Sequence, residues 1–154
     1  MQNNETERLI VPALGPLYAA FRPYAWLLVR VVAGVNLLPH GTQKLFGWFG
    51  GNGIEATVQG FAAMGFEPAA LWVWLVALTE TVGGFCLAVG LLTRPAALAI
   101  AIFLFTAVAH HWANGFFWPQ GGFEYPLLWG VVAVAFAIRG GGAFSLDRLI
   151  GRAF

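Results

Sequence analysis

Charged side chains are scarce in this sequence of 154 residues. Asp, Glu, Lys and Arg together make up 10% of the chain, whereas a soluble domain carries about 25%. Hydrophobic residues make up 59%, and a chain of this length cannot hide so much apolar surface from water. The composition therefore predicts a protein solvated by lipid. The net charge of +1 and the lack of a basic cluster give no indication of a nucleic-acid partner.

Cysteine is almost absent as well. The one cysteine, Cys86, lies in an apolar run, which excludes an internal disulfide and any cluster of cysteine ligands. We interpret Cys86 as a small buried hydrophobe. The sequence also lacks a phosphate-binding loop, a CxxC pair, a nucleophile elbow and a haem-attachment motif. It therefore assigns no catalytic residue and leaves open whether the protein is an enzyme.

Long apolar segments dominate the rest of the chain. Because a spanning helix needs about 20 mostly apolar residues, the sequence predicts an all-α membrane protein with a bundle of four transmembrane helices, at about 23–40, 68–92, 95–113 and 124–140. The fourth is short, and Arg139 must snorkel to the interface for it to span. Residues 1–22 and 141–154 are then tails on the same side of the membrane.

Arginine is distributed unevenly between the two sides of this predicted bundle. The side with both termini and the turn at residues 92–95 carries six arginines: Arg8, Arg22, Arg94, Arg139, Arg148 and Arg152. On the other side, Lys44 is the only lysine or arginine. Cytoplasmic segments of membrane proteins are enriched in Lys and Arg. Both termini are therefore predicted to be cytoplasmic, and Lys44 lies on the outer side.

The connection between the first two predicted helices is long. It runs over about 29 residues, from Pro39 to Glu67, which is more than a compact fold commonly leaves without structure. Within it, apolar residues recur at nearly helical spacing: Ile54, Val58, Phe61, Ala62 and Met64. We expect a short helix here that lies in the membrane interface.

Two charged residues interrupt the predicted spans. Arg30 lies in the first helix and Glu80 in the second, and each costs about 2.5–3.5 kcal/mol at the centre of a helix in lipid. An ion pair between them, facing the bundle interior, is feasible. Such a pair either fixes the register of the two helices only, or forms the polar floor of a cavity and a proton-linked carboxylate beside a redox ligand.

A second group of polar residues is predicted to converge on the outer face of the bundle: His40, Lys44, His110, His111, Asn114 and Glu124. Adjacent positions such as His110 and His111 point about 100° apart on a helix, so both can hardly bind one ion, and we expect no metal site. These residues either satisfy backbone and lipid headgroups, or form a pocket for a flat amphipathic molecule such as a quinone head.

Aromatic residues near this face could form the walls of such a pocket. The candidates are Trp48, Phe49, Trp112, Phe116, Phe117 and Trp118. The alternative is the ordinary belt of aromatic residues that membrane proteins place at the lipid–water interface.

The sequence resembles the DoxX family of small four-helix membrane proteins. An arginine in the first helix is followed by Gly34 and HGxxKLFG at residues 40–47. Glu80 then begins ExxGG, and LxxGLLTR follows at residues 87–94. A glycine-rich GGGAFSLDRLIG covers residues 140–151. The resemblance extends over nearly the whole chain beyond residue 22, and by motif it assigns importance to Arg30, His40, Lys44 and Glu80.

What the resemblance implies is a multi-pass protein of the bacterial inner membrane with a redox-linked role. The family resembles the membrane subunit of thiosulfate:quinone oxidoreductase, so the first hypothesis is a subunit that binds quinone or anchors a redox partner protein, with no covalent cofactor. Alternatives are a non-catalytic accessory subunit of a larger membrane complex and a small-molecule transporter. The ligand-binding residues under the first hypothesis are Arg30, His40, Lys44, Glu80, His110, Asn114 and Glu124.

Overall fold

The computed structural model describes residues 9–152, and within that range it contains helices and no strand. A 3-10 turn, η1 (Pro12–Leu14), leads into the long helix α1 (Gly15–Phe46). The sequence predicted this helix at about 23–40, with residues 1–22 as a tail. Residues 15–22 are instead helical, and residues 1–8 lie outside the described range.

Proline explains why the bounds of α1 were predicted too narrowly. The predicted helix began at residue 23, a proline, but Pro23 and Pro39 both lie inside α1. Interior prolines are tolerated in membrane helices, where neighbouring groups satisfy the freed backbone carbonyl. The helix ends where Gly47 takes a left-handed conformation with φ of 71°, which favours glycine because it has no Cβ.

A short helix follows, as the apolar spacing indicated. After the 3-10 turn η2 (Trp48–Gly50), α2 covers Gly53–Ala63. Its location in the membrane interface stays a prediction. The next helical stretch consists of α3 (Ala69–Leu78), the π-helical turn η3 (Thr79–Gly83) and α4 (Gly84–Val89), without a break. Glu80 lies in the π turn, a local distortion that is frequent at functional sites.

The second half of the chain forms a helical hairpin and a short C-terminal helix. Helix α5 (Thr93–His111) is followed by the turns η4 (Trp112–Asn114) and η5 (Trp118–Gln120), and α6 (Glu124–Arg139) returns alongside it. Helix α7 covers Leu146–Ile150, where the Ser145 side chain caps the helix by accepting from the Arg148 amide.

Membrane spans can be assigned to part of this architecture. Three described helical stretches are long and apolar enough to cross a membrane: Pro12–Phe46, Ala69–Val89 and Thr93–Asn114. Helix α6 has 16 residues, or about 24 Å, which is shorter than a hydrocarbon core of about 30 Å. Over residues 9–152 the protein is therefore an all-helical membrane protein, and a fourth span stays a prediction.

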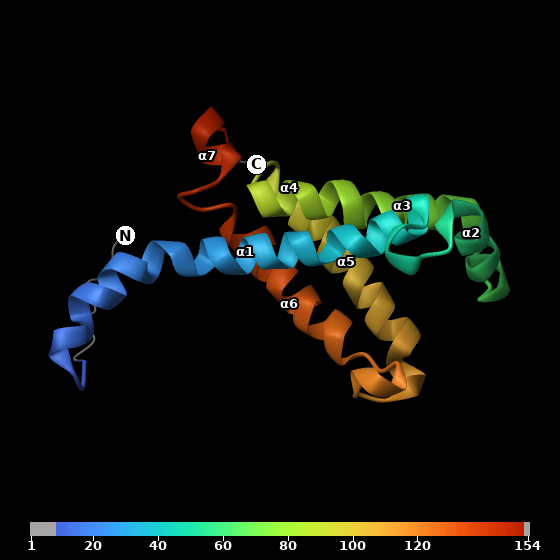
Figure 1. The fold of residues 1–154 in the computed structure, drawn as a ribbon, viewed down its shortest axis with the longest axis horizontal. Coiled ribbons are helices and arrows are strands. Elements are labelled where there is room, and N and C mark those ends of the chain that lie inside the picture. The colour runs from blue at the N-terminus through green and yellow to red at the C-terminus, as the bar shows by residue number, and fades with distance from the viewer. Residues whose placement is uncertain (1–8, 153–154) are drawn as a thin grey trace.

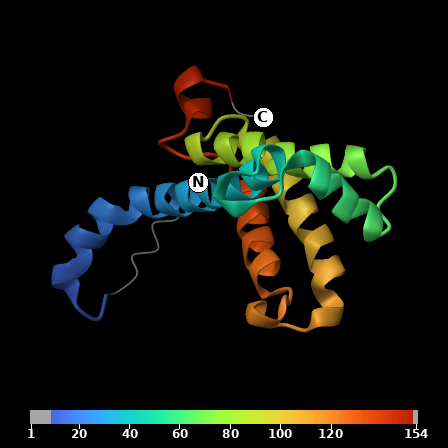
Figure 2. The ribbon, with the colours of Figure 1, turned by 45° about the vertical axis from the view of Figure 1, so that its right-hand side comes forward.

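The helices are arranged as two groups that separate toward one end (Figure 1). Helix α1 runs beside α3 and α4, whereas α5 and α6 pair with each other and diverge from α1 (Figure 2). We call the end with Phe46, Ala69, His111 and Glu124 the outer end, and the opposite end the inner end. Buried residues where the two groups meet form the core: Ala33, Leu37, Leu87, Ala97, Ile100, Ala101, Leu104, Ala133 and Phe136.

Glycine allows α1 to approach α4 closely. A Cβ added at Gly34 would collide with the backbone of Gly84 and Ala88, and one added at Gly41 would collide with Ala77 and Thr81. Small residues at such crossings let the backbones of membrane helices come together. The crossing fixes which residues of the two helices are level, and so determines which charges can meet.

Candidate functional site

A buried ion pair lies near the outer end of the bundle. The Lys44 Nζ donates to Glu80 Oε1 at 2.9 Å and to Oε2 at 2.8 Å. It also donates to the His40 carbonyl oxygen at 3.3 Å, one turn earlier on α1. The Glu80 side chain is 4% exposed and that of Lys44 is 23% exposed. A charge-assisted bond to both carboxylate oxygens offsets part of the cost of burying Glu80.

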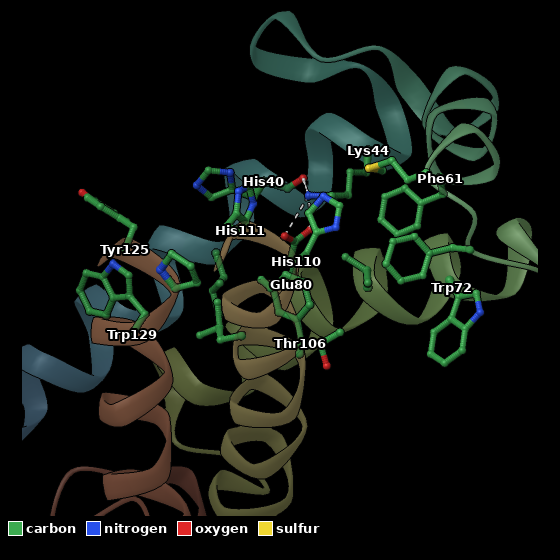
Figure 3. A pocket seen from close by; sticks show the side chains of 18 of the residues that line it. His40, Lys44, Phe61, Trp72, Glu80, Thr106, His110, His111, Tyr125 and Trp129 are labelled. Atoms are coloured by element: carbon green, nitrogen blue, oxygen red, sulfur yellow. Dashed lines mark hydrogen bonds and ion pairs between the residues drawn. The ribbon is translucent and has the colours of Figure 1, made fainter. Parts of the chain in front are cut away.

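The ion pair lies in a pocket of about 600 Å³, a size that is typical of small-molecule sites. Figure 3 shows Lys44 and Glu80 joined at its centre, with Tyr125 and Trp129 to one side and Phe61 and Trp72 to the other. The lining residues come from α1, from α2 and α3, and from the α5–α6 hairpin. The pocket therefore occupies the space that the diverging helix groups leave at the outer end.

Trp129 contributes a polar atom without a partner. Its side chain lines the pocket, and its Nε1 is buried without a hydrogen bond in the described part of the chain. Indole N–H groups can only donate, and a buried polar group without a partner costs free energy. A ligand oxygen is one group that could accept this bond.

Four of the seven predicted ligand-binding residues come together in the pocket: His40, Lys44, Glu80 and His110 line it. The ring of His110 lies between those of Phe66 and His111, at centroid distances of 6.0 and 5.2 Å. Three of them, His40, Lys44 and His110, were predicted to converge on the outer face, whereas Glu80 was considered as a partner of Arg30.

Asn114 and Glu124, also predicted, do not line the pocket. The Asn114 side chain donates to the Gly121 carbonyl oxygen at 3.0 Å, and Glu124 Oε2 accepts from the Trp118 amide at 3.2 Å. His111 lines the pocket and its Nδ1 lies 2.7 Å from the same Gly121 oxygen. In this structure Asn114 and Glu124 hold the α5–α6 loop in shape.

Arg30 is the third predicted residue outside the pocket, and it does not pair with Glu80. It is 1% exposed and donates to the carbonyl oxygens of Gly141 and, at 2.8 Å, Phe144. Gly90 lies against its guanidinium, whereas Gly41 is level with Thr81, beside Glu80. Arg30 is thus about 16 Å along α1 from the level of Glu80. The ion pair that the sequence made feasible between Arg30 and Glu80 is therefore not formed in this structure.

Asp147 completes the polar cluster at the inner end. Its carboxylate accepts from the Leu92 amide at 2.7 Å, and from the Thr93 amide and hydroxyl at 2.9 and 2.7 Å. Burial by itself raises the pKa of Asp147, but the bonds from Thr93 and Leu92, with the charge of Arg30, outweigh it and hold the pKa below its ordinary value. The predicted C-terminal tail is thereby fastened to the bundle as far as Arg152.

Most of the pocket's aromatic walls were missed from the sequence. Of the six predicted wall residues only Trp118 lines it. The other aromatic residues that line the pocket were not predicted: Phe61, Phe66, Trp72, Phe103, Tyr125 and Trp129. Trp72 and Trp129 lie near the outer ends of α3 and α6. The sequence could have indicated them, because each is an aromatic residue in the first two turns of a helix that begins on the outer side.

Among the described residues, no group of three or more His, Cys, Asp or Glu side chains is arranged to hold a metal ion. His110 and His111 present their rings at 84° to each other. The pocket offers hydrogen-bonding groups, a charged pair and aromatic surfaces.

The chain is similar to known proteins over most of its length. It is 27% identical over 124 residues to the protein named "Putative oxidoreductase CatD" of Bacillus subtilis (strain 168), covering 80% of this chain and 85% of that protein. It is 32% identical over 137 residues to an uncharacterized protein of Haemophilus influenzae, covering 83% and 92%. No solved structure matches.

A family model matches more than half of the chain. It is that of DoxX, and it covers residues 25–112. The matched range contains Arg30, His40, Lys44 and Glu80, and thus both halves of the buried ion pair. The chain belongs to the DoxX family.

Proposed function

We propose that this protein is a membrane subunit of an oxidoreductase system and that it binds a quinone in the pocket around Lys44 and Glu80. The observation that carries the proposal is a cavity of about 600 Å³ with aromatic walls and a buried ion pair at its centre. The relative in Bacillus subtilis, named as an oxidoreductase, adds support. His40 and His110 line the same cavity.

The residues of the pocket match the needs of both redox forms of a quinone. Quinone oxygens accept hydrogen bonds, and Lys44 Nζ and the unpartnered Trp129 Nε1 are donors. A quinol donates from its hydroxyl groups, and the Glu80 carboxylate is an acceptor. Reduction of a quinone takes up two electrons and two protons. In this proposal a partner protein supplies the electrons, and this chain binds and orients the quinone.

The site faces the outer side of the membrane in this proposal. The arginines at the inner end favour a cytoplasmic location for that end, in the inner membrane of a bacterium, with both termini cytoplasmic. The ion pair then lies at the level of the outer leaflet, where a quinone head reaches the interface from lipid.

The test combines a pull-down with a titration. Tagged protein is purified in mild detergent, and mass spectrometry identifies extracted quinones and stoichiometric partner proteins. The purified protein is then titrated with a short-chain quinone while tryptophan fluorescence is recorded. Trp72, Trp118 and Trp129 line the pocket, so binding is expected to quench their emission.

Variants locate the binding. The double variant Lys44→Met with Glu80→Gln removes both charges together and is expected to weaken binding at least tenfold. Glu55→Gln removes an exposed carboxylate on α2 and is the control, with unchanged binding expected. A stoichiometric partner protein without any quinone binding would contradict this proposal and favour the accessory-subunit hypothesis.

A further inference from the structure

Polar and apolar groups are distributed unevenly around the pocket. On the side of α1 and α6 lie polar groups of Asn36, His40, Tyr125 and Trp129. On the side of α2, α3 and α5 the lining is mostly apolar, with Phe61, Met64, Phe66, Trp72, Val76 and Phe103, and its polar members are Thr106, His110 and His111 of α5. Figure 3 shows Tyr125 and Trp129 on one side of the Lys44–Glu80 pair and Phe61 and Trp72 on the other.

The apolar side opens between α3 and α5. Trp72 on α3 is 43% exposed and Thr106 on α5 is also exposed, yet both line the pocket. The Thr106 hydroxyl donates to the Ile102 carbonyl oxygen of its own helix at 2.9 Å, so it leaves no unpaired donor in the opening. Both residues lie in stretches that can span a membrane, and the opening therefore faces hydrocarbon.

The depth of this opening suits a lipid-soluble molecule. Trp72 lies in the first turn of α3, and Thr106 lies five residues before the end of α5 at His111. These positions are about 5–8 Å below the outer ends of their helices. A chain leaving the pocket here enters the acyl region of the outer leaflet rather than water.

We infer that the ligand is a quinone with a hydrocarbon side chain, whose ring lies toward α1 and α6 and whose side chain leaves between α3 and α5. This inference rests on the proposed function and adds the class and orientation of its ligand. The hydrocarbon side chain of the quinone is stabilised by apolar contact with Phe66, Trp72 and Val76. If it lay on the opposite side, it would cover His40 and Trp129 Nε1 without offering either a hydrogen bond, which is unfavourable.

Two quinones with the same ring test this inference, one without a side chain and one with a ten-carbon chain. Thr106→Phe narrows the opening, and Ile102→Phe adds the same ring one turn away on α5, at a position that is 62% exposed and outside the pocket lining. Because both residues are exposed, both variants are expected to fold. Dissociation constants are measured by tryptophan quenching in the same detergent, so partition into micelles is common to all proteins.

We expect Thr106→Phe to weaken binding of the long-chain quinone at least tenfold and that of the chainless quinone less than twofold. Ile102→Phe should change neither. Equal effects of Thr106→Phe on both quinones, or no effect on either, would overturn the α3–α5 exit while quinone binding itself stands. If wild-type protein binds neither quinone, the proposed function fails, and this inference falls with it.

Discussion

Lys44 and Glu80 differ in burial, so the cost of removing one charge depends on which of the two is left unpaired. Glu80 is almost fully buried, whereas Lys44 keeps partial access to solvent. Removing the lysine therefore leaves a carboxylate in a low-dielectric site without its counter-charge, and this is commonly more costly than removing the whole pair. The pair also connects α1 to the π turn, so its loss affects the two helices that carry it.

The first prediction compares single and double variants of this pair. Lys44→Met is expected to destabilise the protein by about 3 kcal/mol, because Glu80 stays buried and unpaired. Adding Glu80→Gln should recover most of that loss. The measurement is thermal unfolding in detergent, followed by tryptophan fluorescence. If the double variant were no more stable than Lys44→Met alone, the interaction between the two charges would not be the cause.

At this scale the sequence identified costly charges but not their partners. Arg30, Lys44 and Glu80 all stood out as polar residues in or beside apolar spans. Which of them meet depends on helix register, which is set by the close contacts of Gly34 and Gly41 with α3, η3 and α4. Nothing in the local pattern of either helix encodes that register.

Helix α1 crosses α4 at glycines, and this contact positions the site. Gly34 has no room for a Cβ because the Gly84 carbonyl and the Ala88 backbone occupy that space. Backbone atoms cannot move aside as the end of a side chain can, and overpacking of this kind costs about 1–3 kcal/mol.

The second prediction follows from this crossing. Gly34→Ala should destabilise the protein by about 2 kcal/mol and should also weaken quinone binding, since α1 carries Lys44. Gly60→Ala is the matched control, because nothing lies within 4 Å of the added Cβ and alanine favours the helix by up to about 1 kcal/mol. A destabilisation by Gly60→Ala as large as that by Gly34→Ala would refute the packing explanation.

The C-terminal segment is the element whose role the sequence described least well. It was predicted as a tail, yet Asp147 and the carbonyl groups of Gly141 and Phe144 fasten it to Thr93 and Arg30. Glycine patterns describe local preference, whereas this segment is held by contacts between residues far apart in the chain.

The third prediction concerns pH. The pKa of Asp147 is held below its ordinary value of 3.8, so its stabilisation is complete above about pH 4 and is lost as the pH falls through the lower folded-state value. Asp147→Asn should therefore lower stability by about 2 kcal/mol at pH 7. The difference from wild type should shrink below pH 4. Thermal unfolding from pH 3 to 7 measures it, and a constant difference across that range would disprove the titration of Asp147 as the cause.

The whole molecule is two helix groups that are joined at the inner end and apart at the outer end. The buried core and the Arg30–Asp147 cluster hold the inner end together. Helices α5 and α6 diverge from α1 (Figure 2), and the pocket lies between the two groups at the outer end. Hydropathy predicted a bundle of helices, but not this divergence, since it arises from how the helices pack rather than from the length of each.

The fourth prediction is the orientation of the molecule. In a Cys86→Ala background, Asn52→Cys near the outer end and Ala143→Cys near the inner end are both at exposed positions. A membrane-impermeant maleimide should label Asn52→Cys in intact spheroplasts and Ala143→Cys only after permeabilisation. The reverse pattern would mean that the termini and the arginines lie outside.

The pocket is the central claim, and photolabelling tests it most directly. Protein in lipid nanodiscs is irradiated with an azido-quinone, digested, and analysed by mass spectrometry. We expect labels on pocket residues of α1, α3 and α6, such as His40, Trp72 and Trp129, and competition by excess unlabelled quinone. Labelling that is spread over lipid-facing residues such as Phe85 and Val131, and that excess quinone does not reduce, would contradict a quinone site in this pocket.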